Sequence, residues 1–444
     1  MKIVIVGAGE VGQHLAKLLS SEEQDIILVD TDTEKLARID ANYNLMTKVG
    51  NPSSIRALSE AGTADCDLFI AVTPHAEKNL MACAIAKSLG AVRTVARVDN
   101  YEYLAPENRE FFISHGVNDL IYPEYLAAME IRTSLRHSWA RQWFELHKGE
   151  LILVGVKIRE NSQIVGMQLK EVTQTHHNYH VSAITRRHET IIPRGDDRIM
   201  PGDIVYFTTT PEYTDTLREL CGKSNRQVRK VMIMGASRIA IRLAAMLGNE
   251  YKIKIIDINR DVCRELPLKC PNCEIINGDG RDNDIMLEEG IEEMDAFIAL
   301  TDSSETNILA SLSAKEFGVI KTIAEVENIQ FISEAESLNI GTVINKKLLA
   351  SSRIFQILLD ADAESSKFLS LADAEVAELE VKPGAKVTKA PVKDLNLSHD
   401  MTIGGLVRDG KGMLVNGMTV IQPGDRVVVF CTSGVIHKIE KLFK

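Results

Sequence analysis

The sequence lacks the long apolar run that a membrane-spanning helix requires. No stretch of the 444 residues approaches the roughly 18–20 uninterrupted apolar residues that cross a bilayer. The apolar run that opens the chain, from Ile3 to Val6, ends in a glycine and is too short for the core of a secretory signal. We therefore expect a cytoplasmic protein that reaches the inner face of a membrane only through a partner.

Aromatic residues and cysteines are few, and acidic residues outnumber basic ones, 62 to 51. Aromatic residues make up 5% of the chain, so its cores have to be built mainly from aliphatic side chains. The seven cysteines form no dense framework, which is typical of reduced thiols. The formal net charge of -11 argues against broad electrostatic binding to nucleic acid, and we expect no nucleic-acid partner.

What the sequence does contain is an internal repeat. A short apolar segment runs into a glycine turn at Gly7 and again at Gly235, 228 positions later. The same offset relates the segment Asp-Leu-Phe-Ile-Ala-Val-Thr that begins at Asp67 to Asp-Ala-Phe-Ile-Ala-Leu-Thr at Asp295. Because one offset holds over about 90 residues, the chain is a duplication.

Short apolar segments alternate with helical patterns in the first copy. We expect strands at 2–6, 26–29, 45–49, 68–72 and 93–97, and helices at 11–20, 33–41, 53–61, 76–89 and 123–136. Strands that are apolar on both faces and separated by helices indicate a parallel sheet covered on both sides. The predicted fold class is therefore α/β, with two tandem Rossmann-type doubly wound parallel sheets.

After each predicted Rossmann unit the pattern becomes alternating and β-branched, and each such region contains a Pro-Gly-Asp turn, at 201–203 and 423–425. This pattern predicts a small α+β module after each parallel sheet. We place the four domains at 1–140, 141–221, 228–365 and 366–444. The polar segment 222–227 is the expected linker between the halves.

The first copy carries a dinucleotide-binding fingerprint, G-x-G-x-x-G, directly after a strand and at the head of a helix. In such a motif the first glycine permits a tight turn, the second lets the backbone approach a pyrophosphate, and the third lets the helix pack closely on the sheet. The helix N-terminus offers free N–H groups to phosphates. The candidate binding residues in this motif are Gly7, Ala8, Gly9, Glu10, Val11 and Gly12.

Polar residues also follow the strands of the first copy. Asp30 ends the second strand, where a carboxylate can bind both hydroxyls of an adenosine ribose and repel a 2′-phosphate, which favours NAD(H) over NADP(H). An open α/β sheet places its ligand at these strand ends. The further candidates there are Asn51, Thr73, Pro74 and Arg97. An arginine can clamp a phosphate, although a surface ion pair would explain Arg97 equally well.

The second copy departs from the fingerprint. Its candidate binding residues are Gly235, Ala236, Ser237, Arg238, Ile239 and Asp257. Ser237 stands in place of the second glycine, so a side chain is expected where a pyrophosphate would come closest. Glu325 stands at the position of Arg97 and replaces a positive charge with a negative one. We infer that the second site binds weakly, binds a different nucleotide, or is structural.

The sequence shows no convincing acid–base set beside either binding unit, as a dehydrogenase would need. A duplicated binding unit without duplicated catalytic residues suits a sensor better than an enzyme. An NAD-dependent oxidoreductase is the main alternative, and a soluble redox sensor acting on another protein is a second one.

Two clusters could suggest metal binding, but we expect no metal site in either. The first cluster is Cys263, Cys270 and Cys273, which we expect to be reduced thiols. The second cluster is His176, His177 and His180, which we expect to be surface residues.

With these features the chain resembles the regulator of potassium conductance (RCK) family of potassium-transport nucleotide-binding domains. The resemblance rests on the glycine motif, Asp30, the segment 67–73, Arg97, the degenerate second copy and the Pro-Gly-Asp turns. It implies NAD(H) binding in the first Rossmann domain, with ATP or ADP as an alternative effector.

The same resemblance implies a partner and an assembly. The partner would be a membrane potassium channel or transporter subunit of the Trk or Ktr type. The chain would form a homo-oligomer, a tetramer with a ring of eight RCK domains. Its implied function is that of a cytoplasmic regulatory subunit that gates potassium uptake through a nucleotide-dependent conformational change.

Overall fold

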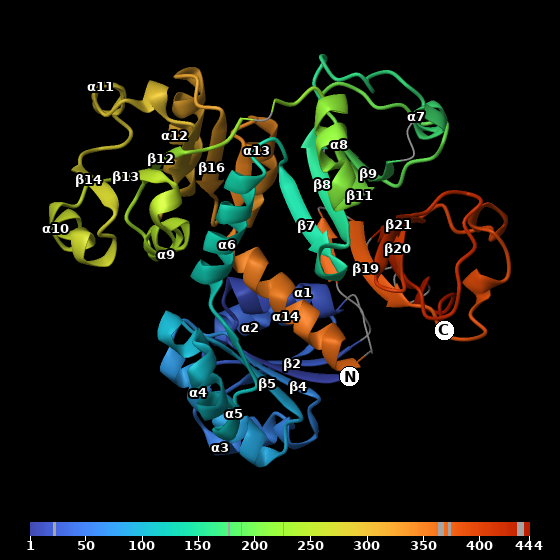
Figure 1. The fold of residues 1–444 in the computed structure, drawn as a ribbon. Helices are drawn as coiled ribbons and strands as arrows, with labels where there is room; N and C mark the ends of the chain where they lie inside the picture. The colour runs from blue at the N-terminus through green and yellow to red at the C-terminus, as the bar shows by residue number, and fades with distance from the viewer. Residues whose placement is uncertain are drawn as a thin grey trace. The chain divides into compact units, whose positions relative to one another are not determined.

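The computed structural model describes residues 1–20, 24–175, 178–187, 189–224, 226–362, 368–371, 374–432 and 439–444 (Figure 1). Contacts divide the chain into two compact units, one of residues 1–128 and 345–358 and the other of residues 129–344 and 359–444. Within the described ranges no helix is both long and apolar enough to cross a membrane. Two histidines of the histidine cluster, His176 and His177, lie outside the described residues, and so does Asn225 of the expected linker.

The first unit contains a six-stranded parallel sheet in the order β3-β2-β1-β4-β5-β6. Strands β1 and β4 are buried on both faces, which explains why their sequences are continuously apolar. The strands are β1 (Lys2–Val6), β2 (Asp25–Asp30), β3 (Met46–Val49), β4 (Leu68–Ala71), β5 (Arg93–Arg97) and β6 (Asp119–Ile121). The helices are α1 (Glu10–Ser20), α2 (Thr33–Asp40), α3 (Ile55–Glu60), α4 (Ala76–Leu89), α5 (Arg109–Ser114) and α6 (Pro123–Arg136).

The five strands and five helices expected in this region are confirmed, with ends that differ by at most two residues. The sequence analysis missed β6 and α5. Both are short, with three and six residues, so neither shows enough repeats of an apolar pattern to stand out.

Helix α14 (Lys346–Asp362) follows the last strand of the second parallel sheet, yet most of it belongs to the first unit. Figure 1 shows it in orange among the blue elements of the first sheet. Near its start, Lys347 Nζ lies 2.5 Å from Glu10 Oε2. Further along it, Arg93 Nη1 donates to the carbonyl of Ile357 at 3.1 Å. A helix from the second half of the chain is therefore bound at two points to the first Rossmann fold.

The second parallel sheet repeats the order of the first, as β14-β13-β12-β15-β16-β17. Its strands are β12 (Lys230–Met234), β13 (Lys252–Asp257), β14 (Cys273–Asn277), β15 (Ala296–Ala299), β16 (Lys321–Glu325) and β17 (Thr342–Ile344). Its helices are α9 (Arg238–Leu247), α10 (Arg260–Lys269), α11 (Asn283–Glu288), α12 (Ser304–Glu316) and α13 (Ile332–Ser337). The repeated order agrees with the duplication read from the sequence.

Two five-stranded antiparallel sheets complete the second unit, in the orders β10-β9-β11-β8-β7 and β18-β19-β22-β20-β21. The first comprises β7 (Gln142–Leu146), β8 (Leu151–Lys157), β9 (Tyr179–Arg186), β10 (Glu189–Ile191) and β11 (Ile204–Thr209), with helices α7 (Leu169–Thr175) and α8 (Thr214–Leu220). The second comprises β18 (Phe368–Leu371), β19 (Ala374–Glu380), β20 (Met401–Arg408), β21 (Lys411–Leu414) and β22 (Arg426–Thr432).

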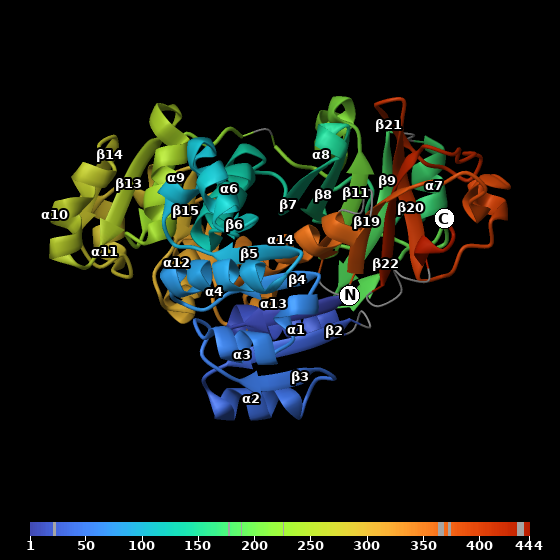
Figure 2. The same cartoon turned by 90° about the horizontal axis from the view of Figure 1, so that it is seen from below.

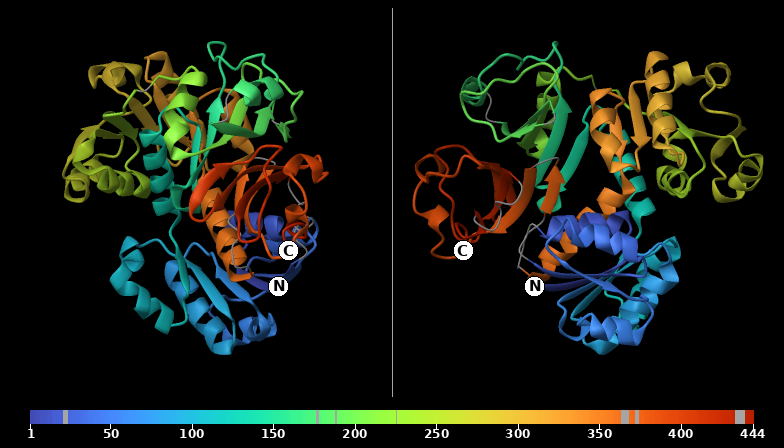
Figure 3. Two further views of the ribbon diagram at one scale, coloured as in Figure 1. Left: turned by 45° about the vertical axis from the view of Figure 1, so that its right-hand side comes forward. Right: turned by 180° about the vertical axis from the view of Figure 1, so that it is seen from behind.

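The two antiparallel sheets share a core, in which Leu151 and Leu153 of β8 meet Val428 and Phe430 of β22. Figures 2 and 3 show the strands of the two modules side by side. The opposite face of β8 lies in the separate core of the first module. Burial on both faces explains why β8 is apolar throughout rather than alternating. With these modules, the predicted fold class is confirmed.

The Pro-Gly-Asp turns have a structural role in both modules. Asp203 is 2% exposed, and both of its carboxylate oxygens accept hydrogen bonds from Arg186, at 2.8 and 2.7 Å. Asp425 makes the same two-fold contact with Arg408, at 2.8 Å for both bonds. Each buried carboxylate is thus paired with a planar guanidinium that also fixes the turn to a neighbouring strand.

Candidate functional site

The three glycines of the turn between β1 and α1 differ in the space around them. Gly7 has a φ of +110°, and a Cβ there would lie 2.9 Å from the backbone nitrogen of Thr73. A Cβ on Gly12 would lie 1.9 Å from the carbonyl oxygen of Gly7. A Cβ on Gly9 would meet no atom within 4 Å. Packing therefore requires Gly7 and Gly12, whereas Gly9 leaves room in front of the α1 N-terminus for a ligand.

Asp30, at the end of β2, faces this turn. Its Oδ2 accepts a hydrogen bond from the backbone N–H of Ala8 at 2.5 Å, and its Oδ1 accepts one from Asp32 at 2.9 Å. The second copy repeats the arrangement, because Asp257 accepts from Ala236 at 2.7 Å and from Asn259 at 2.8 Å. The carboxylates are thus held in place by backbone donors and keep acceptor capacity for ribose hydroxyls.

A buried asparagine joins the ends of β4 and β5. Asn79 is fully buried, accepts from the N–H and hydroxyl of Thr73 at 3.0 and 2.6 Å, and donates to the carbonyls of Thr73 and Arg97. Asn307 makes the same four bonds to Thr301 and Glu325 in the second copy. The hydroxyl of Thr73 is therefore used within the protein.

The sequence analysis missed the role of Asn79, although its match to Asn307 at the same offset was visible. The other candidate residues of the first copy lie around the turn. Pro74 and Asn51 are exposed, Arg97 is partly exposed, and Val11 packs into the core, so only its backbone can face a ligand.

Glu10 has a partner that the sequence could not reveal. It begins α1, and its carboxylate pairs with Lys347 of α14 at 2.5 Å. The Lys347 side chain is 20% exposed and that of Glu10 is 55% exposed. A cation from the second half of the chain is therefore placed beside the first glycine turn, next to the position that a phosphate would occupy.

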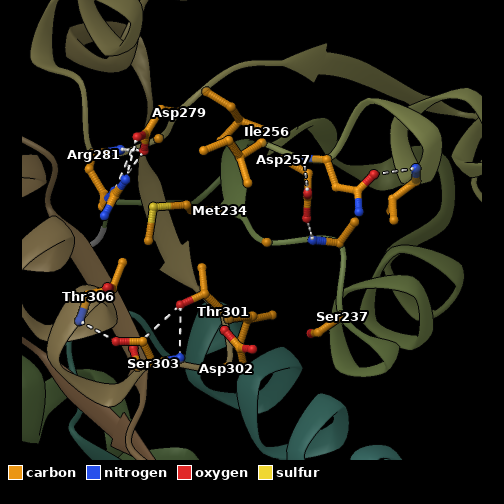
Figure 4. Close-up of a pocket in the computed structure, with 17 residues that line it drawn as sticks. Met234, Ser237, Ile256, Asp257, Asp279, Arg281, Thr301, Asp302, Ser303 and Thr306 are labelled. Atoms are coloured by element: carbon orange, nitrogen blue, oxygen red, sulfur yellow. Dashed lines mark hydrogen bonds and ion pairs between the residues drawn. The ribbon is translucent and has the colours of Figure 1, made fainter.

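The corresponding turn of the second copy opens into a pocket of about 510 Å³ (Figure 4). Four of the candidate residues line it, and polar residues that follow β14 and β15, together with Thr306 of α12, complete it. The four are Gly235, Ala236, Ser237 and Asp257, and the added polar residues are Asp279, Arg281, Thr301, Asp302, Ser303 and Thr306. Arg281 forms a two-pronged ion pair with Asp279, with bonds of 2.7 to 3.2 Å.

Ser237 occupies the place of the missing glycine as a helix cap. Its hydroxyl accepts a hydrogen bond from the N–H of Ala240 at 3.4 Å and so binds one of the donors that a phosphate would use. Ile239 is buried in the core, and Arg238 begins α9. Glu325 is only 2% exposed and is not among the residues that line the pocket, whereas Asp257, Asp279 and Asp302 are.

The structure describes all three residues of the cysteine cluster but only His180 of the histidine cluster. Cys263, Cys270 and Cys273 are free thiols, and burial raises the pKa of Cys263. His180 is half-buried rather than on the surface; its Nε2 lies 3.2 Å from the hydroxyl of Thr402, and burial lowers its pKa to about 4. Among the described residues no group of three potential metal ligands occurs.

Comparison with known proteins assigns both halves to one pair of domain families. The TrkA-N domain model matches residues 3–123 and 231–346, and the TrkA-C domain model matches residues 153–222 and 376–444. The chain is 30% identical to the Trk system potassium uptake protein TrkA of Halomonas elongata, covering 100% of this chain and 99% of that protein. It is 28% identical to the protein of that name from Haemophilus influenzae, with the same coverage.

Solved structures share the fold at low sequence identity. The RCK domain of GsuK matches with a TM-score of 0.61 at 16% identity, covering 100% of this chain and 94% of the other. The GsuK channel bound to NAD matches with a TM-score of 0.60 at 15% identity, covering 100% of this chain and 78% of the channel. The two TrkA-N and two TrkA-C matches together cover most of the chain.

Proposed function

The chain belongs to the TrkA family of potassium-uptake proteins, and we propose that it is a cytoplasmic regulatory subunit that gates a Trk- or Ktr-type potassium channel in response to adenine nucleotides. The observation that carries this proposal is the open space at Gly9, in front of a helix N-terminus and beside a fixed carboxylate. This combination suits a pyrophosphate next to an adenosine ribose.

NAD(H) is the proposed ligand of the first Rossmann domain, with ATP or ADP as an alternative effector. Gly7, Ala8 and Gly9 would surround the phosphates, Asp30 would accept from the ribose hydroxyls, and Arg97 would supply positive charge. Asp30 also disfavours a 2′-phosphate. Among the structural relatives, the GsuK channel has been solved bound to NAD, and GsuK bound to ADP matches this chain with a TM-score of 0.50 at 13% identity.

The ion pair between Glu10 and Lys347 supplies a route from this site to the second half of the chain. A phosphate at the glycine turn would attract Lys347 and compete with Glu10 for it. Because Lys347 is the second residue of α14 and lies three residues after the end of β17, a change at this residue would reach the second sheet through the backbone. Occupancy of the first site would therefore change the placement of α14 in the first unit.

The proposed readout is a change in the shape of an assembly. A full switch of a two-state equilibrium from 1:99 to 99:1 needs about 5.5 kcal/mol of differential binding energy. We propose a homotetramer with a ring of eight RCK domains, built from the domains 1–140, 141–221, 228–365 and 366–444. Several coupled sites would then share that energy.

We propose that the nucleotide is sensed and not consumed. The residues that face the first turn bind and orient, and among the described residues around it we identify no acid–base pair. An NAD-dependent oxidoreductase remains the alternative function. Loss of nicotinamide absorbance when NADH is incubated with the chain and a panel of carbonyl compounds would favour that alternative.

Calorimetric titration with NADH, NAD, ATP and ADP tests the assignment. We expect Asp30→Ala to abolish the tighter binding event and Asp257→Ala to leave it unchanged, because the two carboxylates hold equivalent positions in different copies. If Asp30→Ala binds all four nucleotides as the unaltered chain does, the first site is not the nucleotide site.

A further inference from the structure

A cluster of five cations lies in the second unit, and none of its members lines the pocket at the second glycine turn. We call Arg141, Lys157, Arg159, Lys223 and Lys315 the cationic cluster. Three of its members come from the first β-rich module, just before β7, at the end of β8 and just after β8. Lys223 lies in the segment 222–227 that follows this module, and Lys315 comes from α12 of the second Rossmann domain. Arg159 is exposed and the other four are partly buried.

Three members of the cluster converge on one neutral residue. Arg141 Nη2 and Lys157 Nζ each donate to Asn339 Oδ1 at 3.2 Å, so the two cationic groups are separated by no more than twice that distance. Lys315 Nζ donates to the backbone carbonyl of Asn339. Asn339 has a φ of +58° and follows α13, so its backbone and side-chain oxygens are both available to these donors.

The positive charge of the cluster is poorly compensated. Burial, together with Arg141, Arg159 and Lys157, lowers the pKa of Lys315 to about 8. Burial, followed by the same three cations, lowers the pKa of Lys223 to about 8. Burial and neighbouring cations also lower the pKa of Arg141 and of Lys157, and Glu336 is the one carboxylate that acts to raise them. Within the described part of the chain none of the five forms an ion pair.

Five cations, three of which converge on Asn339, with one opposing carboxylate form a site for negative charge. Asn339 satisfies hydrogen bonds but carries no charge, so mutual repulsion among the cations persists. Arginine and lysine together at close range suit the several oxygens of a phosphate group. We propose that the cationic cluster binds a multivalent phosphate-bearing anion, which bridges the first β-rich module and the second Rossmann domain.

This site is separate from the nucleotide site of the proposed function, and a nucleotide phosphate or an inorganic polyphosphate would satisfy the same chemistry. Thermal unfolding of the full chain with inorganic pyrophosphate, against sodium chloride of equal ionic strength, tests the proposal. We expect pyrophosphate to raise the midpoint and chloride to leave it nearly unchanged. Calorimetry with pyrophosphate and with ATP then identifies which source binds.

The variants are chosen to separate charge from folding. We expect the double variant Lys157→Met/Lys315→Met to unfold at a higher temperature without pyrophosphate, because repulsion is relieved, and to bind pyrophosphate about ten-fold more weakly or worse. Arg159→Gln, at an exposed position, is expected to weaken binding without a folding defect. Lys411→Met, an exposed lysine of the second module, is the matched control and should change neither property.

Two results would overturn the proposal: no pyrophosphate effect on the unaltered chain, or an undiminished effect in both cluster variants. Gly9→Ser, which places a side chain where a phosphate would approach the first glycine turn, should keep the pyrophosphate response of the cluster. A loss of the response in Gly9→Ser alone would show that pyrophosphate acts at the glycine turn and would also refute the cluster as its site.

Discussion

Replacing Gly9 by serine would give the first glycine turn the serine that the second turn carries at the equivalent position, Ser237. A Cβ at Gly9 meets no protein atom within 4 Å, and Ser237 at the equivalent position caps its helix. Since serine is a favourable helix cap, we expect Gly9→Ser to fold with a stability within about 0.5 kcal/mol of the unaltered chain.

The same substitution should weaken nucleotide binding. The new hydroxyl would occupy a backbone donor of α1 and the space in front of it. Losing one charge-assisted hydrogen bond to phosphate costs about 2 kcal/mol, which is roughly a 30-fold loss of affinity. The reciprocal change, Ser237→Gly, should tighten binding at the second pocket. Calorimetry with NADH and urea unfolding measure the two quantities separately.

Gly12→Ala provides the contrast. Its Cβ would lie 1.9 Å from the carbonyl oxygen of Gly7, and backbone cannot move aside as a flexible side chain would. We expect a loss of about 3 kcal/mol in the free energy of unfolding. The reasoning would be refuted if Gly9→Ser bound NADH normally, or if Gly9→Ser and Gly12→Ala lost similar stability.

Three further predictions concern buried polar groups. Asp203→Ala should lower the free energy of unfolding by about 3 kcal/mol in urea titrations, because Arg186 loses its carboxylate partner; a loss below about 1 kcal/mol would contradict the pairing. Asn79→Ala should lower the free energy of unfolding by about 3 kcal/mol, because it leaves several polar groups at the ends of β4 and β5 without a hydrogen-bond partner. Asn51→Ala, at an exposed position, is the control and should change the free energy of unfolding little. Burial raises the pKa of Glu130 from 4.5 to about 7, so its stabilising contribution is present below pH 4.5 and lost as the pH rises to about 7. Buried histidines such as His180, whose pKa burial lowers to about 4, act in the opposite direction over this range, so the unaltered chain has to be compared with Glu130→Gln at each pH. The free energy of unfolding of the unaltered chain relative to that of Glu130→Gln should fall by roughly 2–3 kcal/mol between pH 4.5 and 7, and a difference that does not vary with pH would contradict the assignment.

The regular elements could be predicted because each repeats an apolar pattern several times. Strand β1 and helix α6 have the predicted bounds to the residue. Short β6 offers only three residues of pattern and was missed. The hydrogen bonds that Asn79 makes between the ends of β4 and β5 could have been inferred, because a polar residue that recurs at the same offset in both copies can bind the same backbone groups in each.

Other features depend on contacts that no sequence pattern encodes. Glu10 and Lys347 are distant in the chain, and their pairing requires α14 to return to the first unit. Arg281 has no counterpart in the first copy, so comparison of the copies gave no sign of it. The burial of Glu325, which is 2% exposed and is not among the residues that line the second pocket, could not be read from its position after a strand.

Potassium flux through the partner transporter, reconstituted in lipid vesicles with the purified chain, measures regulation itself. We expect NADH to change the flux with the unaltered chain, to have no effect with Gly9→Ser or Asp30→Ala at the same concentration, and to be recovered intact. A potassium flux that does not change when nucleotide is added, or NADH that is consumed during the assay, would contradict the proposal that the chain senses the nucleotide by binding it without converting it.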